Sequence, residues 1–349
     1  MTTTAFLFHL LFAAFLFLIS VFLCRAMLHR FQIMDIPNER SLHDSPIPRS
    51  GGVSIVVTFI IGIVIIFLFS RSILFIKWHF LGIVISTLLI AGISLYDDIK
   101  SKSYTTKLIA QFLAAAIILV FGMVVDKFNL PFIGRYDIGW LAYPVTFVWI
   151  VGLTNAFNFM DGIDGLAGGV AVIVSTFFCL ITFSQGSLFV YITCYTLIAG
   201  TLGFLVYNFP PARIFMGDVG STFLGFAFAI LAIIAMRYDA SHTSFFVMPL
   251  LLFNFIYDTF FTFMRRLFKG EKVFHAHRTH LYQLFQRLGY SHRTVSLFHY
   301  GVCVLQGLAA FVMVKSSGEE RTLIYLPFLA FQVIYTVIIM IAAKRKNLV

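Results

Sequence analysis

Oxygen-bearing side chains recur at intervals of three in the segment N-A-F-N-F-M-D-G-I-D-G-L-A-G-G, at Asn155, Asn158, Asp161 and Asp164. Residues three apart share one face of a helical turn. Such a face, followed by the N-terminus of another helix, can bind a hydrated divalent cation and a diphosphate. The spacing differs from that of a calcium-binding EF-hand loop. The segment therefore indicates a Mg²⁺–diphosphate site, although Gly165 and Gly169 are also typical of a helix-packing face.

A pair of adjacent carboxylates forms a second candidate. Asp97 and Asp98 repel each other, which costs free energy unless cations or protons compensate. Lys107 follows them and is a candidate to hold a phosphate. One interpretation is a carboxylate that serves as a base or a metal partner, and the alternative is a solvated loop with ion pairs.

A third candidate is Asp218, which lies between Gly217 and Gly220 directly before an apolar run. One interpretation is a carboxylate that caps the N-terminus of the following helix. The other is a magnesium ligand, because Mg²⁺ usually binds one or two protein oxygens while phosphates and water complete its coordination. Arg213 nearby is a candidate partner for Asp218 or for a phosphate.

Three histidines, His275, His277 and His280, lie close together around Arg278. Zinc is disfavoured because neither a nearby cysteine nor an H-E-x-x-H pattern accompanies them. A His and Arg cluster that binds phosphates or uridine is favoured. The residues that follow, 282–289, are compatible with an amphipathic helix at a membrane interface.

Apolar runs separate these polar segments. The chain has 349 residues, of which 60% are hydrophobic and 11% charged, and a membrane-spanning helix needs about 20 apolar residues. We predict an all-α polytopic membrane protein, one membrane-embedded domain over residues 1–349 with about eleven transmembrane helices. The expected spans are Ala5–Leu28, Gly52–Ser70, Trp78–Tyr96, Leu108–Val125, Leu141–Asn155, Leu166–Phe183, Leu188–Tyr207, Thr222–Met236, Phe245–Phe263, Val295–Val314 and Leu323–Ala343.

The placement of basic residues predicts the orientation. With the N-terminus outside (periplasmic), most of the 25 Lys and Arg residues fall in inner segments, as the positive-inside rule requires. We therefore expect a multi-pass protein of the inner (plasma) membrane with a cytoplasmic C-terminus. The net charge of +10 is explained by membrane lipid and anionic substrates, without nucleic acid. The candidate residues fall on the cytoplasmic face, in loops at about 29–51, 97–107, 156–165, 208–221 and 265–294.

Two other classes of function are weaker fits. A lipid-linked sugar transporter or flippase would carry ionisable groups near the bilayer midplane, whereas Asp258 is the main such residue within a predicted span. A non-catalytic scaffold would not need the Asp pair and the Asn–Asp segment together.

The motifs, in this order, resemble those of the polyprenyl-phosphate N-acetylhexosamine-1-phosphate transferases, a superfamily of the glycosyltransferase family 4 type. The resemblance covers essentially the whole chain. It lies closest to the O-antigen-initiating UDP-N-acetylhexosamine:undecaprenyl-phosphate transferases, because the loop reads H-A-H-R-T-H and not three consecutive histidines. The matching segments are D-I-P-N-E-R at 35–40, P-R-S-G-G at 48–52, Asp97-Asp98 with Lys107, 155–169, 215–221 and 275–282.

The resemblance implies a reaction. A sugar 1-phosphate would pass from a UDP-N-acetylhexosamine to undecaprenyl phosphate, UMP would leave, and a lipid-linked O-antigen or other cell-envelope glycan would begin. The sugar stays open among GlcNAc, QuiNAc, FucNAc and GalNAc, and a homodimer is compatible with the sequence.

The resemblance also implies a role for each residue. Asn158 and Asp218 would hold Mg²⁺, with Mn²⁺ as a substitute. Asp97 and Asp98 would lie near the acceptor phosphate, Asp97 as a base or through its charge alone, and Lys107 would hold that phosphate. The substrate-binding candidates are Asn155, Asp161, Asp164, Arg213, His275, His277, Arg278 and His280.

Overall fold

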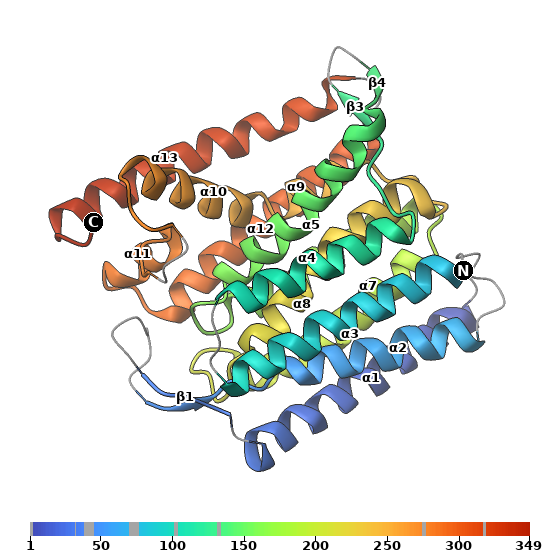
Figure 1. Ribbon diagram of the computed structural model, residues 1–349, viewed down its shortest axis with the longest axis horizontal. Helices are drawn as coiled ribbons and strands as arrows, with labels where there is room; N and C mark the ends of the chain where they lie inside the picture. The colour runs from blue at the N-terminus through green and yellow to red at the C-terminus, as the bar shows by residue number, and fades with distance from the viewer. Residues whose placement is uncertain are drawn as a thin grey trace.

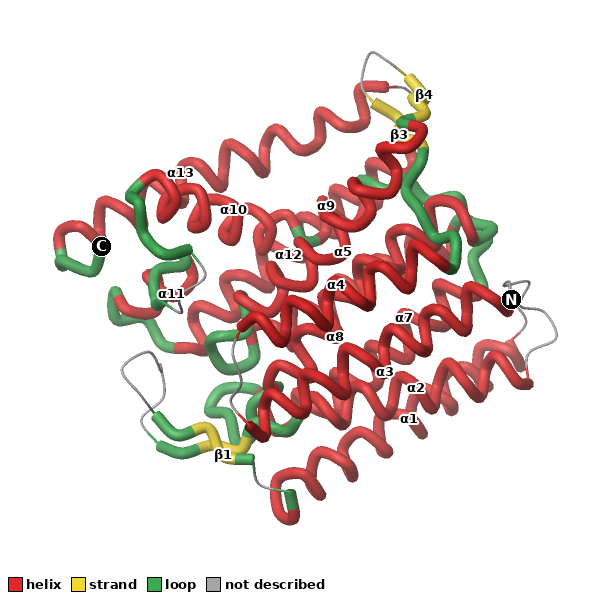
Figure 2. The backbone as a smooth tube through the Cα atoms, in the orientation of Figure 1, coloured by secondary structure: helices red, strands yellow, loops and turns green. Residues whose placement is uncertain are grey.

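The chain folds as a bundle of helices with two short β-hairpins (Figures 1 and 2). The computed structural model describes residues 3–31, 33–37, 45–69, 77–100, 104–130, 134–273, 277–316 and 319–349. The α-helices are α1 (Thr3–Arg30), α2 (Gly52–Phe69), α3 (Lys77–Lys100), α4 (Tyr104–Val120), α5 (Ala142–Phe159), α6 (Leu166–Ser184), α7 (Phe189–Asn208), α8 (Gly217–Ile233), α9 (Val247–Leu251), α10 (Phe253–Phe268), α11 (Leu281–Arg287), α12 (His292–Lys315) and α13 (Tyr325–Arg345).

The hairpins lie at opposite ends of the bundle. Strand β1 (Met34–Asp35) pairs antiparallel with β2 (Ile47–Pro48), and β3 (Lys127–Leu130) pairs antiparallel with β4 (Gly134–Asp137). Figure 1 places β1 and the C-terminus at one end, on the left, and the N-terminus with β3 and β4 at the other.

The apolar composition produces helices of membrane-spanning length. In the described part of the chain, eight helical segments are long and apolar enough to cross a membrane, and α2 and α4 are shorter apolar helices. The prediction of an all-α polytopic membrane protein is therefore confirmed. The number of spans, and the side of the membrane that each end faces, stay predictions.

The expected span Phe245–Phe263 is wrong as one continuous helix. The backbone at Leu252 leaves helical geometry, with φ −105° and ψ 15°, and separates α9 from α10. The two pieces bury different surfaces: α9 buries apolar side chains, whereas α10 buries a polar stripe. An average over hydropathy does not reveal such a division.

Helix α8 forms the centre of the bundle. Every residue from Val219 to Ile233 is buried, and the helix packs against α2, α3 and α5. Close backbone approach requires glycine here, because a Cβ at Gly52 of α2 would collide with the backbone of Gly220 in α8. This contact fixes where α8 begins.

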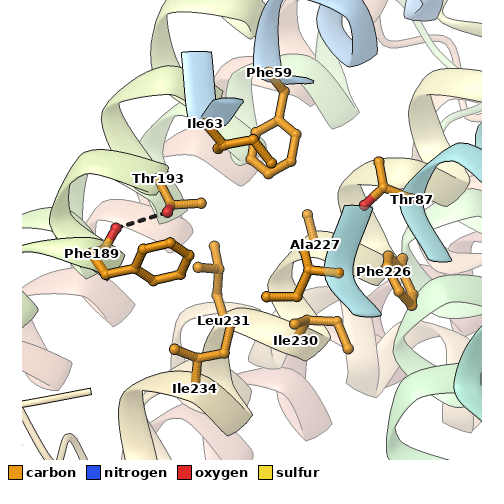
Figure 3. Close-up of a pocket in the computed structure, with 11 residues that line it drawn as sticks. Phe59, Ile63, Thr87, Phe189, Thr193, Phe226, Ala227, Ile230, Leu231 and Ile234 are labelled. Carbon is orange, nitrogen blue, oxygen red and sulfur yellow. Dashed lines mark hydrogen bonds between the residues drawn. The ribbon is translucent and has the colours of Figure 1, made fainter. Parts of the chain in front are cut away.

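An apolar cavity of about 20 Å³ lies between α2, α3, α7 and α8. Figure 3 shows Phe59, Ile63, Phe226 and Leu231 around it. Its lining is apolar, and its volume is close to that of a single water molecule. We regard the cavity as a packing gap and not as a ligand site.

We expect Gly52→Ala to lower the thermal midpoint of the purified protein in detergent. The added methyl group must push α2 and α8 apart, and such overpacking costs about 1–3 kcal/mol. Gly92→Ala in α3 is the matched control, because a Cβ there meets nothing within 4 Å. Equal midpoints for the two variants would contradict the close approach of α2 and α8.

Candidate active site

The site begins where the last turn of α3 meets the first turn of α8. The backbone N–H groups of Asp218 and Val219 donate to the carboxylate oxygens of Asp98 over 3.3 and 3.2 Å. Asp98 is 2% exposed, so this carboxylate sits where a helix N-terminus favours negative charge. The helix cap expected from Asp218 is therefore supplied by Asp98, and Asp218 lies inside the helix.

The segment after β2 holds Asp98 from the other side. Arg49 Nη2 donates to the backbone oxygen of Asp98 over 2.6 Å, and Arg49 Nε lies 3.9 Å from the Asp98 carboxylate. Backbone hydrogen bonds tie this segment to the residues before α8, since Phe215 N–H donates to Pro48 and Gly52 N–H donates to Met216. The hairpin thus clamps α3 against α8.

Asp97, Lys107 and Asp218 form a row of charges beside this clamp. Lys107 Nζ lies 3.0 Å from an oxygen of Asp97 and also forms an ion pair with Asp218. Asp97 is 4% exposed, so the alternative of a solvated loop is wrong: both members of the Asp pair lie on the last turn of α3. One carboxylate oxygen of Asp97, Oδ1, is buried without a hydrogen-bond partner among the described residues.

The last turn of α5 completes this row. Asn158 Nδ2 donates to Asp218 Oδ1 over 2.9 Å and to Ser221 Oγ over 2.8 Å. Asn155, one turn earlier, exchanges hydrogen bonds with Gln111 of α4 over 2.5 and 3.3 Å. Asn158 therefore faces Asp218, whereas Asn155 joins α5 to α4.

Asp161 and Asp164 differ in their surroundings. Asp164 Oδ1 lies 3.1 Å from His292 Nδ1, and Asp164 Oδ2 accepts from the backbone of Ala212 over 3.0 Å. The Asp161 carboxylate forms no hydrogen bond within the described residues, and burial together with the charges of Asp218, Asp98 and Asp164 raises the pKa of Asp161 to about 7. Asp164 thus fastens its loop to α12, while Asp161 is available to a ligand.

The described residues 277–280, called the histidine loop, lie beside the end of α5, where the rings of His280 and Phe159 have centroids 5.9 Å apart. His275 falls outside the described residues. The rings of His277 and His280 stack with centroids 4.9 Å apart, and burial with the nearby charges of His280, Arg266 and Arg265 lowers the pKa of His277 to about 3. The imidazole of His277 is therefore neutral at physiological pH.

Two expectations about nearby segments change. The expected helix is present as α11, but its apolar residues Leu281 and Leu284 pack with Tyr335 and Ile339 of α13, so these two side chains face protein and not lipid. Arg213 is exposed, and in the described ranges it forms no ion pair, with Asp218 or otherwise. Arg278, another of the substrate-binding candidates, lies close to α11, because its backbone oxygen accepts a hydrogen bond from Arg287 over 3.0 Å.

The oxygen atoms of the site are of the type that binds a hard divalent cation. They are too few to complete its coordination without oxygens from a substrate. Carboxylate and amide oxygens of Asp218 and Asn158, with the unpartnered oxygen of Asp97, are the ligand type that Mg²⁺ prefers. Within the described residues, no three His, Cys, Asp or Glu side chains are grouped closely enough to hold a metal. Phosphate and water oxygens would complete the coordination.

Comparison with known proteins places the chain in a family. A family model described as glycosyl transferase family 4 matches residues 80–236. The chain is 32% identical over 286 residues to the "probable undecaprenyl-phosphate N-acetylglucosaminyl 1-phosphate transferase" of Bacillus subtilis, covering 81% of this chain and 78% of that protein. The chain belongs to glycosyl transferase family 4. The expected membership in the superfamily of polyprenyl-phosphate hexosamine-1-phosphate transferases is confirmed.

Two other relatives are similar over different lengths. The "decaprenyl-phosphate N-acetylglucosaminephosphotransferase" of Mycobacterium leprae is 27% identical over 329 residues, 86% of this chain and 79% of that protein. A "phospho-N-acetylmuramoyl-pentapeptide-transferase" of Latilactobacillus sakei is 37% identical over 158 residues, 42% of this chain and 47% of that protein. The family model spans Asp97, Lys107, Asn158 and Asp218.

Two residues of the site were not among the sequence candidates. Arg49 lies in the P-R-S-G-G segment, but its contact with Asp98 depends on the hairpin. Asp258 was noted as a lone carboxylate in an apolar run, and a buried charge of this kind requires partners. This need for partners was the sequence signal that could have marked Asp258 as a functional residue.

We expect Asp98→Asn to destabilise the enzyme more than Asp97→Asn does. The amide introduced at position 98 would turn a donor toward one of the α8 N–H groups, and losing a charged acceptor costs about 1–3 kcal/mol. Asp97→Asn loses one ion pair but also relieves repulsion from its neighbours. Thermal midpoints in detergent compare the two variants, and a larger loss for Asp97→Asn would contradict the assigned roles.

We expect the thermal midpoint in EDTA to fall with rising pH partly through Asp161. Its folded-state pKa lies above the unfolded value, so the folded chain binds the proton more tightly and loses this stability as the pH rises through 7. The measurement is the midpoint of wild type and Asp161→Asn between about pH 5.5 and 8.5. The variant should show a flatter dependence, and parallel curves would contradict the prediction.

Proposed function

We propose that this enzyme transfers an N-acetylhexosamine 1-phosphate from a UDP-sugar to undecaprenyl phosphate and releases UMP. The observation that carries the proposal is the convergence of Asp97, Lys107, Asn158 and Asp218 from the ends of four helices. The names of the relatives in Bacillus subtilis and Mycobacterium leprae support the substrate classes, a polyprenyl phosphate and an N-acetylglucosamine phosphate. We further propose that the site faces the cytoplasm and that the product begins an O-antigen or another cell-envelope glycan.

The proposed step is a phosphoryl transfer. A phosphate oxygen of the acceptor lipid forms a bond to the β-phosphorus of the UDP-sugar, and the bond from that phosphorus to the α–β bridging oxygen breaks. UMP leaves with the bridging oxygen, and the sugar stays on the β-phosphate. Such a transfer needs mainly positioning and charge neutralisation.

The charged residues of the site suit this step. Lys107 lies between Asp97 and Asp218, where its ammonium group can bind an incoming phosphate. A phosphomonoester acceptor is already mostly ionised near neutral pH, so proton abstraction by Asp97 contributes little. We propose that Asp97 acts through its position and charge.

A divalent cation fits the same place. Asp218 and Asn158, with the free oxygen of Asp97, would hold Mg²⁺ or Mn²⁺. When bound, the cation would neutralise charge on the diphosphate and lower the barrier to its cleavage. Two residues act on the position of Asp218 itself. Asn158 orients its carboxylate, and Asp98 fixes α8, the helix that carries Asp218.

The sugar is the least constrained part of the proposal. Relatives that match most of the chain are named for N-acetylglucosamine. The loop H-A-H-R-T-H, in contrast, resembles that of O-antigen-initiating enzymes that accept 6-deoxy sugars such as QuiNAc or FucNAc. Offering UDP-GlcNAc, UDP-GalNAc, UDP-QuiNAc and UDP-FucNAc to the purified enzyme separates these cases. A clear preference for UDP-GlcNAc would overturn the interpretation of the loop.

We expect the purified enzyme with Mg²⁺, undecaprenyl phosphate and a UDP-sugar to release UMP, and Asp218→Asn to reduce this turnover on the order of 10²-fold or more. The reason is that Asp218 loses the charge that holds both Lys107 and the cation. Asp137→Asn, an exposed carboxylate at the opposite end of the bundle, is the control.

Two results would count against the proposed function. Near-wild-type turnover in Asp218→Asn would contradict the assignment of Asp218 as a ligand of the cation. Movement of a lipid-linked sugar across vesicles without UMP release would favour a flippase instead.

A further inference from the structure

Helix α10 is polar on its buried side. Asn254, Asp258, Thr262 and Arg266 follow one another at intervals of four and are all buried, so they line one face of the helix. The opposite side is apolar and exposed, with Phe260 64% and Phe268 83% exposed. A polar stripe buried in this way needs a partner for each group.

The partners of Asp258 come from the histidine loop. Its Oδ1 accepts from His280 Nδ1 over 3.1 Å and from the backbone of Leu281 over 2.9 Å, and its Oδ2 accepts from the backbone of Tyr282 over 3.0 Å. Thr262 Oγ1 donates to Oδ1 over 3.1 Å. Asp258 is 2% exposed, so these four donors replace water around a fully enclosed carboxylate.

This contact determines how His280 presents its ring. A carboxylate on Nδ1 fixes the ring orientation and leaves Nε2 as the atom directed elsewhere. The ring lies near His277, with centroids 4.9 Å apart, and near Phe159, with centroids 5.9 Å apart. Asp258 therefore fixes the ring of His280, against which the ring of His277 stacks.

The same helical turn reaches the end of α5. Tyr282 is fully buried, and its hydroxyl donates to the backbone oxygen of Phe159 over 2.9 Å. Phe159 is the neighbour of Asn158, and a side chain at Gly162 would collide with the Tyr282 hydroxyl. The histidine loop and the loop of Asp161 thus share one anchor.

We propose that Asp258 is a positioning residue for donor binding. It holds His280 and the first turn of α11 so that the histidine loop and the end of α5 together form the pocket for the nucleotide-sugar. This inference rests on the proposed function for the identity of the donor. It assigns no contact between Asp258 and a substrate, because the carboxylate is enclosed by its four protein donors.

The test compares Michaelis constants for the two substrates. Asp258→Asn keeps the side-chain shape but turns a donor toward one of the three N–H groups, and we expect the KM for the preferred UDP-sugar to rise about tenfold. The KM for undecaprenyl phosphate should change less than about twofold, since the Lys107 side of the site is untouched. Equal changes in both constants, or no change in either, would overturn the proposal.

A double variant tests whether Asp258 acts through His280. If it does, Asp258→Asn combined with His280→Gln should raise the donor KM no more than His280→Gln alone. If the two substitutions instead multiply each other's effect on the donor KM, Asp258 does not act through His280. Should Asp258→Asn fail to fold, Tyr282→Phe removes the hydroxyl that binds Phe159 and that also interacts with Gly162 and Gln283. This variant should still raise the donor KM selectively, and an unchanged donor KM would overturn the shared anchor.

Hydrogen–deuterium exchange and UMP release together distinguish this inference from the proposed function. Hydrogen–deuterium exchange over residues 277–287 needs no activity, and Asp258→Asn should exchange faster there than wild type; unchanged exchange would overturn the anchoring role. Asp239→Asn is the matched control, a buried carboxylate that accepts from the backbone of Ser241 over 2.9 Å. Absence of UMP release in wild type with faster exchange in Asp258→Asn would reject only the proposed function.

Discussion

The rest of the site depends on one interaction, the Asp98 carboxylate on the first amides of α8. A helix N-terminus has unsatisfied N–H groups, and here they are satisfied by a residue of another helix. The bond therefore fixes α3 and α8 relative to each other. Lys107 and Asn158 then meet Asp218 at the start of α8, and Arg49 holds the arrangement from the hairpin.

Charge compensation is the second constraint. Several carboxylates lie close together here, and burial of Asp161, together with the charges of Asp218, Asp98 and Asp164, raises its pKa to about 7. Lys107 and Arg49 offset part of this negative charge through ion pairs. The remaining negative charge is the reason why we propose a divalent cation at this site, which would in turn allow a diphosphate to approach.

The sequence was sufficient to predict an all-α membrane protein whose polar segments form one site. The reason is that the length of an apolar run and the types of residue in a motif are local properties of the chain. The sequence did not reveal that adjacent Asp97 and Asp98 have different partners, since that depends on how α3 meets α8. Nor did it separate Asp161 from Asp164: both are acidic and three apart, but only Asp164 has His292 within reach. The division at Leu252 was missed because hydropathy averages hide a polar stripe inside an apolar helix.

The reversed polarity of α10 bears on how the protein is made. Asn254 bonds with His299 of α12 and Gln332 of α13 over 2.5 and 2.7 Å. During synthesis α10 leaves the ribosome before either partner exists, so Asn254 is then without these two hydrogen bonds, and a buried amide without partners costs free energy. The packing around Asn254 is therefore complete only once α12 and α13 are in place, which ties α10 to the C-terminal helices of the chain.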